Sequence, residues 1–165
     1  MSTTEERLDR MEAIEALRRL KHEHYCLAVD RAVCRSDRAE YDALVERLAP
    51  DIEVTFTGFG RFSGKEAAAP FFIDGVGSML SWCQHRVGNP IIDVDGDTAR
   101  GQWTVFCPAI ATDAAPTGPG PIIIVGRYDE RYRRTDGRWY WTHLDARLEL
   151  LGPAEAFWQG AAWAE

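Results

Sequence analysis

The chain has 165 residues, of which 45% are hydrophobic and 27% are charged, a composition typical of a globular domain with its own core. Its formal net charge of -7 argues against nucleic acid as a partner, because a phosphate-binding surface needs a basic face. No apolar stretch approaches the ~20 residues of a membrane span, and residues 1–10 lack the apolar core of a signal peptide. We therefore expect a single cytoplasmic domain over residues 1–165 that binds no membrane.

The 4 cysteines show neither C-x-x-C spacing nor the density of a disulfide framework. We interpret them as free thiols, with a metal site as the less favoured alternative. No motif indicates a catalytic cysteine. The residues are Cys26, Cys34, Cys83 and Cys107.

The first half of the chain is predicted to be mainly helical. Residues 5–31 carry apolar side chains at steps of three and four, uninterrupted by Gly or Pro. A second helix follows the capping pair Ser36-Asp37 and ends at Pro50. The period then changes to two over residues 52–56, which predicts a half-buried strand, and residues 65–72 predict a short helix.

From residue 82 onward the pattern predicts mostly strands. Asp95-Gly96 and residues 135–137 are turn signals for two long hairpins, which pair 82–94 with 98–110 and 122–134 with 139–150. Between the hairpins, residues 111–121 are rich in Pro and Gly and predict a flexible loop of the kind that often covers a pocket. Helices followed by antiparallel strands indicate an α+β fold. We expect a cone-shaped α+β barrel, with helices packed on a strongly curved, mostly antiparallel sheet around an apolar pocket.

Four stretches carry a family resemblance: AIEALRRLKHEHYCLAVDR, GRFSGKEAA, QHRVGNPIIDVDGDTARGQW and GRYDERYRRTDGRWYWTHLDA. Their order resembles the SnoaL-like group of the nuclear transport factor 2-like superfamily. That group includes polyketide cyclases, scytalone dehydratase, bile acid dehydratase and hexachlorocyclohexane dehydrochlorinase. The resemblance extends from Ala13 to Ala146.

The resemblance implies a catalytic pair. In the dehydratase and dehydrochlorinase members, an Asp near the end of the first helix holds a His that acts as the base. The matching residues are Asp30 and His85, and the functional Tyr or Lys five positions before the Asp corresponds to Tyr25. Two positions depart from these relatives. Leu144 replaces an arginine of the dehydrochlorinase, and Cys107 replaces a second acid of the bile acid dehydratase, which speaks against dehalogenation and against a copy of the bile acid site.

The chemistry of an Asp–His pair suits elimination or isomerisation. A neutral imidazole, with an unperturbed pKa of about 6.5, can take a proton from carbon or oxygen, and a carboxylate on one ring nitrogen fixes its tautomer. The alternatives are a structural strand histidine for His85, a surface carboxylate for Asp30 and a buried, satisfied hydroxyl for Tyr25. Residues five apart on an α-helix are about 140° apart around its axis. Tyr25 and Asp30 can therefore line one cavity if the pocket wraps the helix or if the helix loosens near Asp30.

Further substrate-binding candidates are His24, Gln102, Thr104 and His143. His24 lies on the apolar stripe of the first helix. Strand alternation predicts that His143 shares a face with Trp141, and a structural role is the alternative for it. We expect neither a cofactor nor a metal.

These features together favour a cofactor-independent lyase of dehydratase type, or an isomerase, with a small hydrophobic cyclic substrate such as a steroid, polyketide or terpenoid. The alternatives are a non-catalytic module that binds a hydrophobic ligand and an accessory subunit of the same fold. By resemblance we also expect a homo-oligomer, either a trimer or a dimer.

Overall fold

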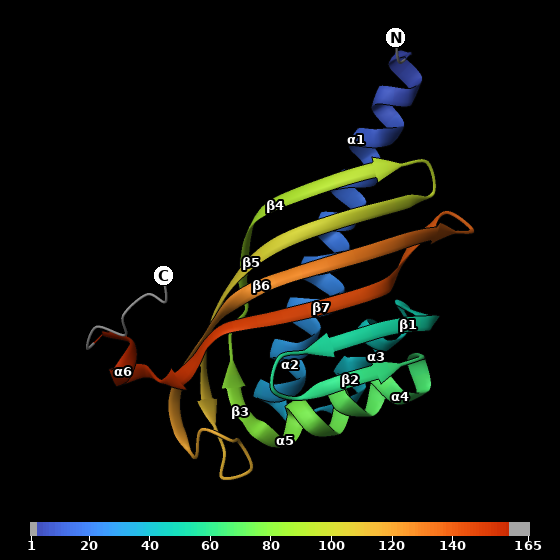
Figure 1. Cartoon of the computed structure of the whole chain (residues 1–165). Coiled ribbons are helices and arrows are strands. Elements are labelled where there is room, and N and C mark those ends of the chain that lie inside the picture. The colour runs from blue at the N-terminus through green and yellow to red at the C-terminus, as the bar shows by residue number, and fades with distance from the viewer. Residues whose placement is uncertain (1–2, 159–165) are drawn as a thin grey trace.

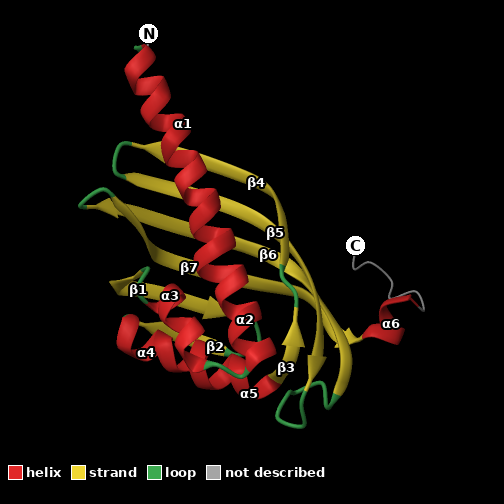
Figure 2. Cartoon of the chain, turned by 180° about the vertical axis from the view of Figure 1, so that it is seen from behind, coloured by secondary structure: helices red, strands yellow, loops and turns green. Residues whose placement is uncertain are grey.

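The computed structural model describes residues 3–158 as a curled sheet with helices packed against its concave side (Figure 1). The helical elements are α1 (Thr4–Arg19), η1 (Leu20–Leu27), α2 (Ala28–Arg35), η2 (Arg38–Tyr41), α3 (Asp42–Val45), α4 (Lys65–Pro70), η3 (Phe71–Val76), α5 (Gly77–Met79) and α6 (Ala154–Trp158). α1, η1 and α2 follow one another without a break and cross one face of the sheet (Figure 2). None of the helices in residues 3–158 has both the length and the apolar run needed to cross a membrane.

Within the described residues, a 7-stranded sheet has the order β2-β1-β7-β6-β5, and both β3 and β4 pair with β5. β1 and β7 are parallel, and the other pairs are antiparallel. The strands are β1 (Leu48–Phe56), β2 (Gly60–Ser63), β3 (Leu80–Cys83), β4 (Arg86–Asp95), β5 (Thr98–Ala111), β6 (Gly120–Thr135) and β7 (Arg138–Pro153). The predicted α+β fold, with helices packed on a strongly curved, mostly antiparallel sheet, is thus confirmed, and the sheet forms a half-barrel. The structure is of one chain, so the homo-oligomer stays a prediction.

A glycine permits the sharp bend that β6 and β7 share. The register between these strands shifts at Val125/Gly126, a β-bulge that increases local twist. A Cβ atom at Gly126 would lie 2.2 Å from the carbonyl oxygen of Arg147, so only glycine allows this close approach. The bend curls the sheet around the helices (Figure 1).

Several predicted boundaries were wrong. The first helix extends to Arg35 rather than to residue 31, and β1 already begins at Leu48, before Pro50. The helical path also continues through Pro70 into η3. The start of the predicted apolar stripe is exposed, with Leu8 at 55% and Met11 at 67%, because α1 projects past the sheet (Figure 1).

The long helix is fixed to the sheet by a fully buried ion pair. Lys21 in η1 and Glu130 in β6 are both 0% exposed, and Lys21 Nζ lies 2.6 Å from Glu130 Oε1. The second oxygen, Glu130 Oε2, accepts hydrogen bonds from the Tyr132 hydroxyl and from Trp141 Nε1, the latter at 3.0 Å. The carboxylate is therefore satisfied on both oxygens, as a charge removed from water requires.

The ammonium of Lys21 also stacks on two aromatic rings. Its Nζ lies 3.3 Å from the centroid of the Tyr128 ring and 3.8 Å from that of Tyr25. Cation–π contacts of this kind are stronger when the cation is desolvated. Lys21 thus orients two tyrosines on the inner side of the helix.

Removing one partner of this pair should destabilise the fold strongly. We expect Lys21→Met to lower the free energy of unfolding by about 3–5 kcal/mol, because Glu130 is left as an uncompensated buried charge. The double variant Lys21→Met/Glu130→Gln should recover most of that loss, since the amide oxygen still accepts from Trp141. Urea denaturation measures both changes.

The matched control is Arg19→Met. Arg19 forms an ion pair with Glu23 on the solvent side of the same helix, at 3.1 Å. Exposed pairs contribute about 0.5 kcal/mol or less, so this variant should unfold close to the wild type. Equal effects of Lys21→Met and Arg19→Met would contradict a structural role of the buried pair.

Candidate active site

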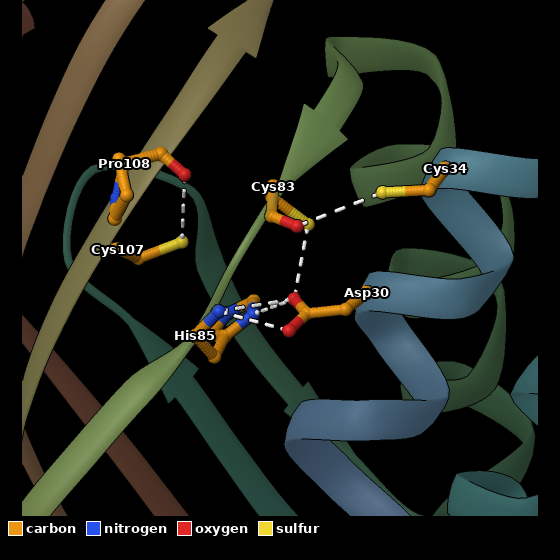
Figure 3. A network of polar contacts seen from close by, with 6 residues as sticks. All are labelled: Asp30, Cys34, Cys83, His85, Cys107 and Pro108. Atoms are coloured by element: carbon orange, nitrogen blue, oxygen red, sulfur yellow. Dashed lines mark hydrogen bonds and ion pairs between the residues drawn. The ribbon is translucent and has the colours of Figure 1, made fainter.

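Asp30 and His85 form a close hydrogen-bonded dyad between α2 and the start of β4 (Figure 3). Asp30 Oδ1 lies 2.6 Å from His85 Nδ1. The backbone N–H of His85 donates to both carboxylate oxygens, at 3.1 and 3.0 Å, and the Cys83 thiol donates to Oδ1 at 3.3 Å. Because Nδ1 is bound to the carboxylate, Nε2 is the ring nitrogen available for proton transfer.

A break in the strand creates this geometry. The sequence predicted one strand over residues 82–94, but β3 ends at Cys83 and β4 begins at Arg86. Gln84 still donates its N–H to the Pro108 carbonyl at 3.1 Å, whereas the N–H of His85 leaves the ladder. A buried N–H needs a partner, and the carboxylate of Asp30 provides it. Asp30 therefore fixes both the backbone and the ring of His85.

Tyr25 reaches the same histidine because the helix is loosened. Residues Leu20–Leu27 form a π-helix, whose i→i+5 hydrogen bonds make each turn wider than that of an α-helix. The Tyr25 ring lies edge-on to His85 with the centroids 5.8 Å apart. The structure thus brings together Tyr25, Asp30 and His85, and the loosened helix is one of the two arrangements that the sequence left open.

The His85 side of the dyad borders an apolar cavity of about 80 Å³. Asp30 lies behind His85 and is not among the residues that line it. The loop 112–119 forms part of the wall through Ala115, Pro116 and Thr117. The remaining lining residues are Tyr25, Val29, Phe56, Phe59, Phe71, Phe72, Val76, Met79, Leu80, His85, Ile122, Ile124, Tyr128, Leu148 and Leu151.

The surroundings of His85 hold its ring in the charged form. Burial lowers the pKa of His85, but the hydrogen bond to Asp30 and the neighbouring Cys107 raise it, and the balance brings the pKa to about 9. Burial raises the pKa of Tyr25 well above its usual value, against a hydrogen bond from Tyr128 that lowers it. At neutral pH the site therefore offers an imidazolium and a neutral phenol.

Two cysteines that sequence reasoning left without a role also belong to this cluster. The Cys107 thiol donates to the Pro108 carbonyl oxygen at 3.8 Å, and the proximity of Cys83 and His85 lowers the pKa of Cys107, against burial, which raises it. The proximity of Cys107, together with burial and the charge of Asp30, raises the pKa of Cys83. The spacing of Cys83 two residues before His85 was the available signal, because side chains alternate along a strand and residues two apart share a face.

The dyad has the geometry of a hydrogen bond rather than of a metal site. Ligand atoms of Asp30, Cys83 and His85 lie within 4.8 Å of one another, close enough to consider an ion. Tetrahedral zinc, with bonds of about 2.0 Å to nitrogen and oxygen, would separate those two atoms by roughly 3.3 Å. The observed 2.6 Å between Nδ1 and Oδ1 is much shorter and fits a shared proton.

The four further binding candidates do not line the cavity. His24 bonds the Ala43 carbonyl oxygen at 3.0 Å, at the contact between η1 and the segment of α3. Gln102 and Thr104 are exposed and contact Asp129 and the Gly88 carbonyl, because alternation along β5 turns them outward.

The prediction that His143 shares a face with Trp141 was wrong. A β-bulge shifts the register between these residues, so that Trp141 pairs with buried Tyr132 whereas His143 pairs with exposed Arg131. The extra residue turns His143 to the other face of the sheet, away from the dyad. It has no part in the site that we describe.

The comparisons with known proteins agree with this fold. A family model described as a SnoaL-like domain matches residues 9–145. A comparison with curated proteins gave no match. Among solved structures, the type 2 hexachlorocyclohexane dehydrochlorinase LinA superposes with a TM-score of 0.73 at 22% identity, over 96% of this chain and 97% of that one.

Two further structures are similar. The LinA type 3 enzyme of Novosphingobium barchaimii LL02 gives a TM-score of 0.71 at 22% identity, over 96% of this chain and 98% of that one. A protein of Novosphingobium aromaticivorans named for scytalone dehydratase gives a TM-score of 0.68 at 18% identity, over 93% of this chain and 97% of that one. At these sequence identities the similarity to the solved structures shows the fold alone. The family is shown by the SnoaL-like domain model, which covers most of the sequence. The chain belongs to the SnoaL-like domain family and has its nuclear transport factor 2-like fold.

Proposed function

We propose that the protein is a cofactor-independent lyase of dehydratase type, or an isomerase, which acts on a small hydrophobic cyclic substrate. The observation that carries this proposal is the His85 ring, backed by Asp30 at 2.6 Å and bordering an apolar cavity. A carboxylate-held imidazole in a water-poor site is an efficient general acid and base. Two of the similar structures bear the names of a dehydrochlorinase and a dehydratase, which supports elimination chemistry.

The protonation of the site orders the steps. His85 is charged at neutral pH, so its Nε2–H first donates a proton to the leaving hydroxyl of the substrate, which departs as water. The resulting neutral imidazole then accepts the proton that the adjacent carbon loses as the double bond forms. Tyr25 donates a hydrogen bond to a substrate oxygen such as a ring carbonyl. In an isomerisation, His85 would move one proton between two carbons instead.

The residues present favour loss of water over loss of halide. A leaving chloride is best stabilised by a cation, whereas Leu144 is apolar and 0% exposed. One part of the cavity wall is aromatic, with Phe56, Phe71 and Phe72 packed on one another. Such a wall suits flat ring systems, which stack on or against phenyl rings. A ring system larger than the cavity would require the loop 112–119 to open.

A binding module without catalysis is the second candidate. The cavity's polar groups are few, since His85, Tyr25, Tyr128 and Thr117 stand among apolar side chains. Burial of a ligand's apolar surface would supply affinity there without any reaction.

Conversion of a substrate distinguishes the enzyme from the binding module. We expect a panel of β-hydroxy ketones on naphthalenone and steroid rings to yield conjugated enones, followed by ultraviolet absorbance. His85→Gln and Asp30→Asn should each lower kcat by at least about 100-fold, because both remove positioned proton transfer. The control His143→Gln lies outside the cavity and should keep the wild-type rate. Ligands that quench tryptophan fluorescence on binding, but are never converted, would instead support the binding module.

The protonation of His85 can be tested without a substrate. We expect its ring to titrate near pH 9 in nuclear magnetic resonance spectra, assigned by comparison with His85→Gln. Asp30→Asn should lower the midpoint, because burial, which lowers the pKa, is then opposed by Cys107 without the carboxylate. Turnover that begins with proton donation should fall as the pH rises through the wild-type midpoint. A wild-type midpoint at or below about 6.5 would contradict this order of steps.

A further inference from the structure

A second pocket, which we call the arginine pocket, lies on the surface between the long helix and the start of β7. Its volume is about 220 Å³, and it shares no lining residue with the cavity beside His85. Its walls come from α1 and η1, from the segment that joins α3 to β1, and from the turn between β6 and β7 with the first residues of β7. The proposed elimination chemistry uses none of these residues.

The charges around the arginine pocket are positive. Arg19, Arg47 and Arg138 line it, and no Asp or Glu is among its described lining residues. Arg19 forms an exposed ion pair with Glu23 at 3.1 Å. In the part of the chain that the structure describes, Arg47 and Arg138 have no carboxylate partner, and the Arg47 guanidinium lies 6.0 Å from the centroid of the Tyr140 ring. Such a local excess of positive charge contrasts with the net charge of -7 of the whole chain.

Two further polar groups belong to the arginine pocket. His24 Nδ1 lies 3.0 Å from the Ala43 carbonyl oxygen, which can only accept, so Nδ1 carries a proton and Nε2 is left for another partner. Once the ring is protonated, Nε2 donates as well. Trp139 is 5% exposed, and its indole N–H, which can only donate, has no hydrogen-bond partner among the described residues. The pocket therefore combines unpaired cations with an unsatisfied donor.

The chemistry that fits these groups is that of an oxyanion. The planar fork of a guanidinium matches the oxygens of a carboxylate or of a phosphate. Like charges that converge without a counter-charge repel one another, and a bound anion replaces that repulsion with attraction. Leu20 and Trp139, both buried, also give the pocket an apolar floor against which a small hydrocarbon body can pack.

We propose that the arginine pocket binds a small oxyanion, a phosphate or a carboxylate group. Arg47 and Arg138 donate to its oxygens, and Trp139 and the protonated ring of His24 add further donors. His24 is then a ligand-binding residue, as the sequence suggested, but at a site other than the cavity. The bound oxyanion links η1 to the start of β7 and so adds a bridge between the helix and the sheet.

Binding at such a bridge should stabilise the folded chain. The site is assembled from three segments that are distant in the sequence, so the unfolded chain cannot present it. A ligand that binds only the folded state raises the midpoint of thermal unfolding, and the rise grows with the concentration of the ligand.

The experiment titrates the full chain with inorganic phosphate, phenyl phosphate and benzoate at constant ionic strength, with chloride as the reference anion. Two-dimensional nuclear magnetic resonance spectra report binding, and thermal unfolding reports stabilisation. We expect saturable shifts of the signals of His24, Arg47 and residues 137–139, together with a higher unfolding midpoint. Binding of the phosphates alone assigns the site to a phosphate group, binding of benzoate alone assigns it to a carboxylate, and binding of both identifies a general oxyanion site.

Variants of single arginines test whether the arginine pocket itself is responsible. Arg138→Gln should weaken binding of the preferred anion by at least about 10-fold, because charge-assisted hydrogen bonds are lost. Arg138 is exposed, so this variant should fold like the wild type. The matched control is Arg61→Gln, which removes the same charge from an exposed arginine of β2 outside the pocket. It should bind the anion with the affinity of the wild type.

Three results would overturn the proposal. The first is the absence of saturable shifts with all three anions. The second is chloride that causes the same shifts as the oxyanions, because screening of the whole surface would then explain them. The third is an equal affinity of Arg138→Gln and Arg61→Gln for the preferred anion.

Discussion

The ion pair between Lys21 and Glu130 holds the helix in the one position from which the site can form. Both charges are fully buried, so each needs its partner more than an exposed pair would. Glu130 is further bonded by Tyr132 and Trp141, and Trp103 extends the network with a hydrogen bond of 3.1 Å to the Tyr132 hydroxyl. A network with every member satisfied favours a single packing. The helix therefore cannot slide along the sheet without breaking these bonds.

That position determines what Tyr25 and Asp30 can reach. Lys21 lies within the π-helical segment, and its ammonium stacks on the Tyr25 ring one turn further along. Asp30 follows in α2, directly opposite the strand break that leaves the N–H of His85 without a ladder partner. The break and the carboxylate depend on each other: without Asp30 the N–H would be buried and unpaired, and without the break the ring would lie elsewhere.

The sequence allowed much of this fold and the core of the site to be predicted, because both rest on local patterns. The family resemblance pointed to Asp30, His85 and Tyr25, which the structure brings together, and the chain reverses at the turn signals Asp95-Gly96 and Asp136-Gly137. Gln102 and Thr104 were expected to bind substrate, yet along β5 they alternate with apolar Trp103 and Val105, so the same strand pattern could have placed them on the exposed face.

The features that escaped prediction depend on contacts between distant segments. A bulge inserts one residue and so reverses the facing of His143, although nothing in the local pattern marks it. The burial of Lys21 was also hidden, since a lysine in a helix is normally exposed and its partner Glu130 is 109 residues away. The four cysteines carry no motif in the sequence. Cys83 and Cys107 come close to His85 only because β3 pairs with β5 in the folded chain.

The buried charges of the site constrain its chemistry more than any single residue does. Burial lowers the pKa of His85, but the hydrogen bond to Asp30 and the neighbouring Cys107 outweigh burial and keep the His85 proton in place. A ring that is protonated at neutral pH has a proton to give, so donation to the leaving group comes before acceptance, and its raised pKa makes it a weaker acid than a free imidazolium. Asp30, whose Oδ1 lies 2.6 Å from His85 Nδ1, serves both proton transfers. It stabilises the imidazolium before donation, and it holds the neutral ring in the tautomer whose Nε2 accepts the next proton.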